Sequence, residues 1–481
     1  MRHLLVVAFA AFALVVCGGS LDPQQTAPPR VPSAPTPPVD AGAPGDPATS
    51  TDAGTPGDPA TTTDAGTPGD PATTADAGPA QPGADAGTPP AKPLAATPPM
   101  GWNDWAHYQC WISEQIILDN ARALVTSGLA KKGYDTVTVD DCWMASARDA
   151  TGTLVADSDK FPHGMAWLGE RLHSMGLKFG IYEDAGATTC GGYPGSGQPD
   201  GGGSDHFAQD AKLFASWGVD YLKLDGCAVW IPPGQSGEQA YRNAYAAQSA
   251  ALALAGRTIV FSESTPAYFQ HQSNWESVLG WVGQYGQLWR LGEDIQIFDA
   301  WSPANNRWTS VLNNYAYTRD MGRFTHPGNW NDPDFIIGGD PGTTAEEARS
   351  QFSLWTMMSA PLILSSDLTQ VTQSAAMVAM LGNADVIAVD QDALGEPAAV
   401  TVGADLDVLV KRLAGGDRAV AFFNHSSATA SYAIGADQLG FASCSGCAYR
   451  IKNLWDGSPA AQISAAVPSH GTVLFRVGQV H

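Results

Sequence analysis

Carboxylates follow several strand-like runs in the middle of this chain, at the points where the runs end. Acidic residues come directly after the β-rich runs Thr136–Val139, Lys178–Tyr182 and Tyr221–Leu224. With later clusters, the polar set at such positions comprises Asp140, Asp141, Glu183, Asp184, Lys223, Asp225, Ser262, Glu263, Arg290, Glu293, Asp294, Asp332 and Asp334. An acidic residue after a strand often only caps the next helix. Asp140 and Asp141, however, are flanked by apolar residues on both sides, which a cap does not explain.

A pocket of carboxylates with one lysine, Lys223, and one arginine, Arg290, is suited to glycoside hydrolysis. That reaction needs one carboxylate that stays ionised and another that is protonated near neutral pH. The main alternative is a Ca²⁺ or Mg²⁺ site, because aspartate oxygens also bind these cations. The sequence has no EF-hand spacing, and the two basic side chains would repel a cation. We therefore expect hydrolysis without a metal or organic cofactor.

The segments that carry these residues alternate between strand-like and helix-like patterns from about Thr97 onward. Further β-rich runs cover Thr258–Phe261 and Pro361–Leu364, and amphipathic segments lie between the runs. The sequence Thr344-Ala-Glu-Glu347 predicts a capping box that opens a helix running toward Met358. About 300 residues of alternating pattern predict a (β/α)8 TIM barrel over residues 98–393, in which the carboxyl ends of the strands meet at one mouth.

The two ends of the chain differ from this pattern. After about Leu394, short alternating runs such as Val408–Leu413 and Arg418–Asn424 predict a small antiparallel β-sandwich domain over residues 394–481. Residues 20–97 are rich in Pro, Ala, Gly, Thr and Asp and contain a twelve-residue repeat that starts at Asp40 and recurs at Asp52. A segment with so few large apolar side chains cannot offset the entropy of ordering, so we expect a disordered linker.

The first 19 residues resemble an export signal. Arg2 and His3 precede an apolar run that is too short to span a bilayer comfortably and that ends at Cys17. The residues before Cys17 resemble a bacterial lipobox, although Val16 stands where a small residue is usual. We therefore expect a secreted or cell-envelope protein, tethered to the membrane through a lipid on Cys17 or released by a plain signal peptide.

The charge and the tryptophan content narrow the class of ligand. The formal net charge is −23, which argues against nucleic acid, because nucleic-acid binding depends on Lys and Arg at the phosphates. The chain has 15 tryptophans, and an indole face covers the apolar face of a pyranose well. A carbohydrate is therefore the expected partner.

Seven cysteines are present, and setting Cys17 aside leaves an even six (7 − 1 = 6) for an oxidising compartment. Cys444 and Cys447 are separated by two residues. No second pair of this kind and no paired His accompany them, so a short disulfide is favoured over a redox or zinc motif.

Several motifs together resemble the glycoside hydrolase family of α-galactosidases and α-N-acetylgalactosaminidases, the melibiase type. They run in order from Pro98 to about Gly395 and comprise Pro-Pro-Met-Gly-Trp-Asn-Asp-Trp105, Asp140-Asp-Cys-Trp143, Gly180-Ile-Tyr182, Trp217-Gly-Val-Asp-Tyr-Leu-Lys-Leu-Asp225-Gly-Cys227, Trp330-Asn-Asp-Pro-Asp334 and Ala360-Pro-Leu-Ile-Leu. The resemblance implies a retaining exo-glycosidase that removes terminal α-linked galactose-type sugars.

The resemblance also implies a role for each site residue. Asp225 corresponds to the catalytic nucleophile, and Asp294 corresponds to the general acid/base. The implied sugar-binding shell comprises Trp105, Asp140, Asp141, Tyr182, Lys223, Arg290 and Asp334. In this mechanism Asp225 attacks C1 to form a glycosyl-enzyme, and the two carboxyl groups stand about 5 Å apart. A desolvated acidic pocket is expected to raise the pKa of Asp294, so that it can protonate the leaving oxygen.

Two disulfides of the family are implied, Cys110 with Cys142 and Cys190 with Cys227. A third bridge is missing, because Glu263 and Gly286 stand where many relatives carry cysteines.

The loop Phe261–Tyr268 contacts the C2 substituent of the sugar in this family. The small residues Ser264 and Ala267 leave room for an acetamido group, and the same loop adds Tyr268 to the predicted substrate-binding set. The sequence therefore favours an α-N-acetylgalactosaminidase, with an α-galactosidase as the alternative. A sugar-binding protein without turnover is a remote third possibility, because both catalytic aspartates are present.

Overall fold

Eight parallel strands in one sheet form the larger part of the structure, and the order of neighbours is β7-β6-β5-β4-β3-β2-β1-β8. This computed structural model describes residues 93–295, 306–340, 342–442 and 446–480. The bounds are β1 Met100–Asn103, β2 Thr136–Val139, β3 Lys178–Asp184, β4 Tyr221–Asp225, β5 Val260–Glu263, β6 Leu288–Arg290, β7 Trp330–Asp332 and β8 Leu362–Leu364. A parallel bridge from Ile336 to Leu364 links the chain after β7 to β8 and completes the (β/α)8 barrel.

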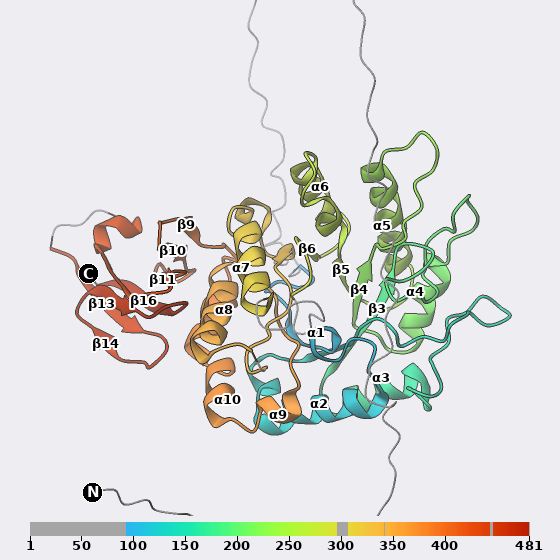
Figure 1. Cartoon of the computed structure of the whole chain (residues 1–481), viewed down its shortest axis with the longest axis horizontal. Coiled ribbons are helices and arrows are strands. Elements are labelled where there is room, and N and C mark those ends of the chain that lie inside the picture. The colour runs from blue at the N-terminus through green and yellow to red at the C-terminus, as the bar shows by residue number, and fades with distance from the viewer. Residues whose placement is uncertain (1–92, 296–305, 341, 443–445, 481) are drawn as a thin grey trace, which may run out of the picture. The chain divides into compact units, whose positions relative to one another are not determined.

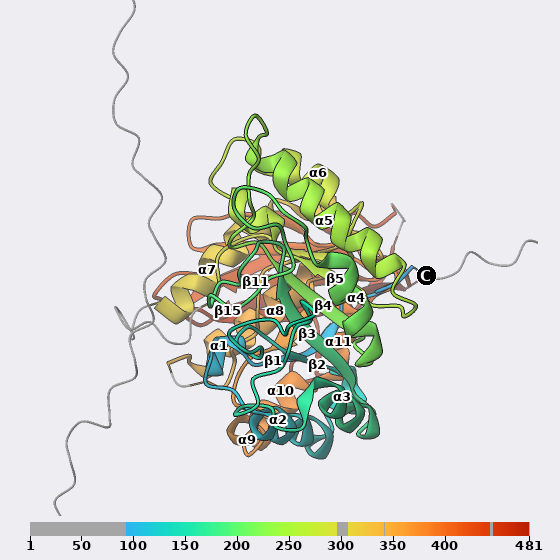
Figure 2. The ribbon, with the colours of Figure 1, turned by 90° about the vertical axis from the view of Figure 1, so that its right-hand side faces the viewer.

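Helices connect the strands and cover the outside of the barrel (Figure 1). Figure 2 shows β1 to β5 between α2 and α3 on one side and α5 and α6 on the other. The bounds are α1 Trp105–Tyr108, α2 Glu114–Ser127, α3 Gly164–Ser174, α4 Phe207–Ser216, α5 Gly237–Ala253, α6 Trp275–Val282, α7 Asn306–Arg319, α8 Ala345–Met357, α9 Leu368–Val371, α10 Ala375–Leu381 and α11 Ala384–Asp390. None of the helices in the described residues is long and apolar enough to cross a bilayer.

Local sequence signals fix where these helices begin and end. The predicted capping box is present, because the Thr344 hydroxyl accepts the amide of Glu347 and the Glu347 carboxylate accepts the amide of Thr344. The helix that it opens ends at Met357. Helix α2 ends at Gly128, which adopts the left-handed backbone (φ 84°) that glycine reaches without strain.

The barrel strands run further into the polar residues than their apolar pattern predicted. Strand β3 continues to Asp184 and pairs there with Asp225, and β5 starts at Val260 and continues to Glu263. Backbone pairing in a sheet does not depend on side-chain polarity, so the strands end where their neighbours end. Asp184, Asp225 and Glu263 consequently stand on the sheet itself rather than on loops.

A six-stranded antiparallel sheet, in the order β14-β13-β16-β11-β10-β9, and a two-stranded sheet of β12 and β15 form the C-terminal domain. Its bounds are β9 Ala399–Thr401, β10 Leu406–Arg412, β11 Arg418–Asn424, β12 Ala430–Ile434, β13 Ala448–Asn453, β14 Pro459–Ala460, β15 Ile463–Val467 and β16 Thr472–Val480. This arrangement confirms the antiparallel β domain that the alternating runs predicted. The predicted boundary between residues 393 and 394 lies between α11 and β9.

The central strands of this domain bury both faces. Along β11, Val420 and Phe422 pack within the sandwich, whereas Ala421 and Phe423 join the apolar core of the barrel. This alternation follows from the two-residue period of a strand. Asp407 of β10 also accepts a hydrogen bond from the Tyr315 hydroxyl of α7 at 2.9 Å, so the two domains share polar as well as apolar contacts.

The predicted export signal with Cys17, the repeat linker up to residue 92 and Cys444 all lie outside the described residues. The predictions made for them stay predictions.

Candidate active site

Every predicted site residue lies at or just beyond the carboxyl end of a barrel strand. The positions, in strand order, are Trp105 after β1, Asp140 and Asp141 after β2, Tyr182 in β3, Lys223 and Asp225 in β4, Ser264, Ala267 and Tyr268 after β5, Arg290 in β6, Asp294 after β6 and Asp334 after β7. The strand ends of a barrel converge on one mouth, which brings these side chains together.

Lys223 stands at the centre of this arrangement. Its ammonium contacts Asp140 Oδ2 at 2.8 Å and lies 5.1 Å from the centre of the Tyr182 ring. Burial alone would lower the pKa of Lys223, but Asp140, Asp225 and Asp294 outweigh burial and raise it above its ordinary value. The lysine is therefore a permanent positive charge that faces three carboxylates from different strands.

The two oxygens of Asp225 differ in their contacts. Oδ1 accepts a hydrogen bond from the Tyr268 hydroxyl at 2.5 Å and another from the amide of Gly226 at 3.0 Å. Among the described residues, Oδ2 accepts no hydrogen bond. One oxygen is thus held in place while the other is free to react.

Arg290 joins the remaining carboxylates. Its guanidinium contacts Asp294 Oδ1 and Asp334 Oδ1, both at 2.9 Å, and the Trp105 indole donates to Asp294 Oδ2 at 3.3 Å. Burial raises the pKa of Asp334 to about 7 even though Arg290 opposes this shift.

The prediction of a raised pKa for Asp294 is wrong in this structure. Burial raises the pKa of Asp294, but Arg290 and Lys223 outweigh burial, and the net shift is downward. The Asp294 side chain is also 53% exposed, so its loss of solvent is incomplete and the two cations dominate. The sequence pattern showed the acidic surroundings but not the position of the guanidinium beside this carboxylate.

Asp141 is positioned by the backbone of two loops. Its oxygens accept the amide of Gly191 at 2.7 Å and that of Cys142 at 2.6 Å, and burial raises its pKa. Both implied disulfides are present, and they tie these loops together: Cys110 to Cys142, and Cys190 to Cys227.

Other polar groups of the site were not singled out from the sequence. Asn103 donates to Asp140 Oδ2 at 2.6 Å, and Asp104 accepts the amide of Asp140 at 2.8 Å. Asn103 and Asp104 lie in the same motif as Trp105, so their position next to it was the available signal. Asp184, which belongs to the acidic residues noted after the strands but had no assigned role, accepts the amide of Cys227 at 3.0 Å.

A cation site is geometrically conceivable at one point of the described residues, where ligand atoms of Asp184, Cys190, Asp225 and Cys227 lie within 4.8 Å of one another. The two sulfur atoms are bonded to each other, so neither offers a thiolate. Two carboxylates beside Lys223 do not make a metal centre.

Two models of protein families match this chain. The family model described as Alpha galactosidase A matches residues 97–392, and that described as Alpha galactosidase C-terminal beta sandwich domain matches residues 403–477. The chain belongs to the alpha-galactosidase A family. It is therefore a glycoside hydrolase with a carbohydrate substrate, and net retention of anomeric configuration is general for this family.

Individual relatives agree with this assignment. The chain is 40% identical to alpha-galactosidase A of Aspergillus niger over 391 residues, which cover 80% of this chain and 69% of the relative. The solved alpha-galactosidase I of Mortierella vinacea is 31% identical with a TM-score of 0.70, covering 80% of this chain and 98% of that one. The alpha-galactosidase of Saccharomyces cerevisiae, solved with raffinose, is 27% identical with a TM-score of 0.68 and the same coverage.

Glu263, the last residue of β5, carries an unusual buried carboxyl group. Neither oxygen of this group has a hydrogen-bond partner among the described residues, and a Cβ on Gly286 would lie 2.5 Å from Oε1. Glu263 and Gly286 are therefore spatial neighbours, as expected of two positions where relatives carry a cysteine pair. Burial raises the pKa of Glu263 well above its ordinary value.

We expect Glu263→Gln to remove one pH-dependent contribution to stability. A raised folded-state pKa favours the folded protein fully below the unfolded value of about 4.3, and this contribution is lost as pH rises toward the folded pKa. In denaturant titrations from pH 4 to 8, the free energy of unfolding of the variant should therefore fall less steeply with pH than that of the wild type. Glu170→Gln, at an exposed position, is the control, and parallel pH curves for wild type and Glu263→Gln would contradict a raised pKa at Glu263.

Proposed function

We propose that this chain is an α-galactosidase, which releases terminal non-reducing α-linked galactose from carbohydrates. The sequence favoured N-acetylgalactosamine because Ser264 and Ala267 leave space near C2. The relatives reported above are named alpha-galactosidases, and the nearer of them is 40% identical, which supports the alternative. The observation that carries the catalytic part of the proposal is the cluster of carboxylates around one buried ammonium, with Asp225 Oδ2 left free.

In the proposed mechanism Asp225 is the nucleophile. The hydrogen bonds from Tyr268 and Gly226 hold Oδ1, so Oδ2 is available to attack C1 of the sugar. The C1–Oδ2 bond forms as the bond to the leaving oxygen breaks, and water later displaces Asp225 from C1. Two displacements at the same carbon give net retention.

Asp294 is the proposed general acid and base. In the free enzyme its carboxylate faces Arg290, and its pKa is lowered, which suits the second step, where it removes a proton from water. The first step needs the protonated form. Because half of the side chain is exposed, a bound substrate would displace solvent from it and raise its pKa toward the value that proton donation requires.

The remaining site residues are assigned to the sugar hydroxyls. Asp140 and Asp141 are rigidly oriented acceptors, since Lys223 and the amide of Gly191 fix one oxygen of each. A site that places two acceptors for a particular pair of hydroxyls disfavours an epimer, because the wrong epimer leaves buried oxygens unpaired.

The catalytic pair can be tested by substituting each aspartate separately. Asp225→Asn should lower kcat on the order of 10⁴-fold or more for every substrate, because it removes the nucleophile. Asp294→Asn should lower kcat/KM by about 10²- to 10⁴-fold for substrates with poor leaving groups, and much less for aryl galactosides whose leaving group needs no proton, because kcat/KM contains only the first displacement. Equal losses of kcat/KM for both leaving groups with Asp294→Asn would refute its role, and a loss of kcat below about 100-fold in Asp225→Asn would refute the role of Asp225.

The pH profile tests the charge that acts on Asp294. Arg290→Met removes the guanidinium that lowers the pKa of Asp294, so a general acid at this position would keep its proton to higher pH. The alkaline limb of kcat/KM should therefore move to higher pH, whatever the overall loss of activity. Trp105→Phe, which removes only the indole hydrogen bond, should move the limb less in the same direction. A limb that stays in place or moves to lower pH would show that another group is the acid.

The sugar preference can be decided by comparing kcat/KM for aryl α-galactoside and aryl α-N-acetylgalactosaminide. We expect galactoside to be favoured by at least about tenfold, which corresponds to about 1.4 kcal/mol of transition-state binding. The double variant Ser264→Glu with Ala267→Leu fills the C2 space and should abolish any residual acetamido activity. Equal values of kcat/KM, or a preference for the acetamido sugar, would instead support the α-N-acetylgalactosaminidase that the sequence favoured.

A further inference from the structure

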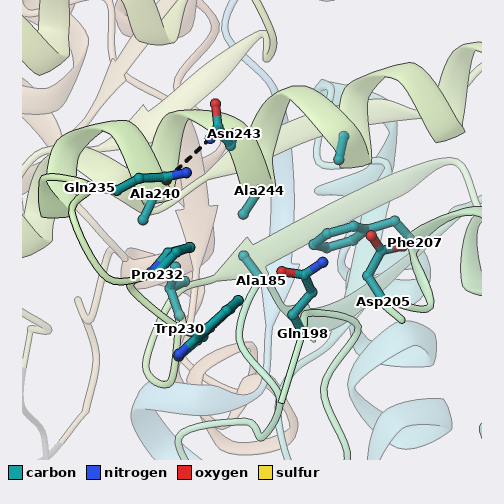
Figure 3. Close-up of a pocket in the computed structure, with 12 residues that line it drawn as sticks. Ala185, Gln198, Asp205, Phe207, Trp230, Pro232, Gln235, Ala240, Asn243 and Ala244 are labelled. Carbon is teal, nitrogen blue, oxygen red and sulfur yellow. Dashed lines mark hydrogen bonds between the residues drawn. The ribbon is translucent and has the colours of Figure 1, made fainter. Parts of the chain in front are cut away.

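A cavity of about 240 Å³ lies between helix α5 and the loops that follow β3 and β4. We call it the α5 cavity. It is distinct from the predicted site, because none of the predicted site residues lines it. Figure 3 shows Gln198 and Trp230 on one side of the hollow and Ala240 and Ala244 of α5 on the other. Its volume is below that of most ligand pockets, which start at roughly 300 Å³, so it suits a single ring rather than a large ligand.

Small residues create the hollow, and one indole forms its wall. Ala240 and Ala244 of α5 face Ala185, so no long side chain fills the space between them. Trp230 is partly exposed and packs against Gly202, where a Cβ would lie 3.2 Å from its ring. Gly202 has φ +90°, so a side chain there would be strained as well as crowded. The loop thereby supports the tryptophan from outside the cavity.

Polar groups around the cavity have capacity for a ligand. Within the described part of the chain, the exposed side chains of Gln198 and Asp205 make no hydrogen bond or ion pair. Across the cavity, Asn243 Nδ2 donates to Gln235 Oε1 over a long 3.4 Å, and Asn243 Oδ1 accepts from Gln239 at 2.7 Å. Among the described residues, Gln235 Nε2 makes no hydrogen bond. Side-chain amides donate to and accept from vicinal hydroxyls, and a carboxylate accepts from them. The face of an indole covers the apolar face of a pyranose.

The charge of the lining narrows the ligand further. Asp205 is the charged residue among the lining residues, and no Lys, Arg or His of the described ranges lines the cavity. A phosphate, carboxylate or sulfate ligand would find no cation there and would be repelled by Asp205. A neutral molecule with several hydroxyls is the chemistry that remains.

The α5 cavity lies directly behind the strand end that carries Asp225. The amide of Ala185, in its lining, donates to the carbonyl of Asp225 at 2.8 Å, and the Cys190–Cys227 bridge joins the two loops that flank it. We propose that the α5 cavity is an accessory binding site for a neutral pyranose ring of a larger carbohydrate, separate from the catalytic pocket. This extends the proposed hydrolase function, but ring binding itself requires no catalysis.

The test compares Trp230→Ala with Trp167→Ala, a partly buried tryptophan on α3 that does not line the cavity. Each variant is assayed with an aryl α-galactoside and with a galactomannan. Trp230→Ala should leave kcat/KM for the aryl substrate within about twofold and raise KM for the polymer about five- to tenfold, the loss expected for one aromatic contact. Trp167→Ala should change neither, and thermal unfolding verifies that both variants fold.

A binding measurement separates this proposal from the proposed function and identifies the source of the ring. Asp225→Asn, with its catalytic pocket saturated by galactose, is titrated by NMR with manno-oligosaccharides and with free mannose. Binding of these sugars to Asp225→Asn supports the site if Trp230→Ala weakens it at least fivefold, even if no α-galactoside were hydrolysed. Tighter binding of the oligosaccharides than of free mannose identifies a polymer as the ligand. Absence of binding, an equal effect of both tryptophan variants, or equal losses on aryl and polymeric substrates would overturn the proposal.

Discussion

The buried ammonium of Lys223 is the charge that lets carboxylates gather at the mouth of this barrel. An ionised carboxylate without a partner is costly to bury, and several close together repel one another. Lys223 contacts Asp140 at 2.8 Å and acts electrostatically on Asp225 and Asp294 as well. Removing it would leave these carboxylates without the positive charge that faces all three of them. The other features of the site are ways of placing carboxylates around this charge.

The parallel sheet performs that placement. Strand β4 carries Lys223 and Asp225 two residues apart, so both point to the same face of the strand, into the barrel. Asp184 is in register with Asp225, and the turns beyond are joined by the Cys190–Cys227 bridge. Because backbone pairing continues through this polar strand end, Asp225 stands on the sheet itself, whereas Asp294 lies on the loop after β6.

The sequence predicted what depends on residue type and periodicity. The alternation of strands and helices predicted the barrel, and Thr344 with Glu347 predicted the start of α8. It could not predict what depends on the final geometry. Cys142 and Asp334 have left-handed backbones (φ 72° and 76°), a conformation that residues other than glycine adopt only where the surroundings impose it.

The sequence could not predict the pKa shifts of individual carboxylates either. Asp294 and Asp334 each follow another acidic residue closely in the chain, and both contact Arg290 at 2.9 Å. Their pKa values nevertheless move in opposite directions, down for Asp294 and up for Asp334. At Asp294, Arg290 and Lys223 outweigh burial, whereas at Asp334 burial and the charges of Asp294 and Asp332 outweigh Arg290. No pattern of residue types encodes that difference.

The polar groups of the mouth also bear on the ligand. Burial raises the pKa of Asp104, Asp141, Asp184 and Asp332 above their ordinary values, and at Asp332 the charges of Arg290 and Lys223 oppose this shift. Lys223 contacts Asp140, and Arg290 contacts Asp294 and Asp334, so several carboxyl groups of the mouth have a cationic partner. Carboxyl groups, a lysine, an arginine and an indole at one mouth supply both acceptors and donors, and the hydroxyls of a neutral sugar need both.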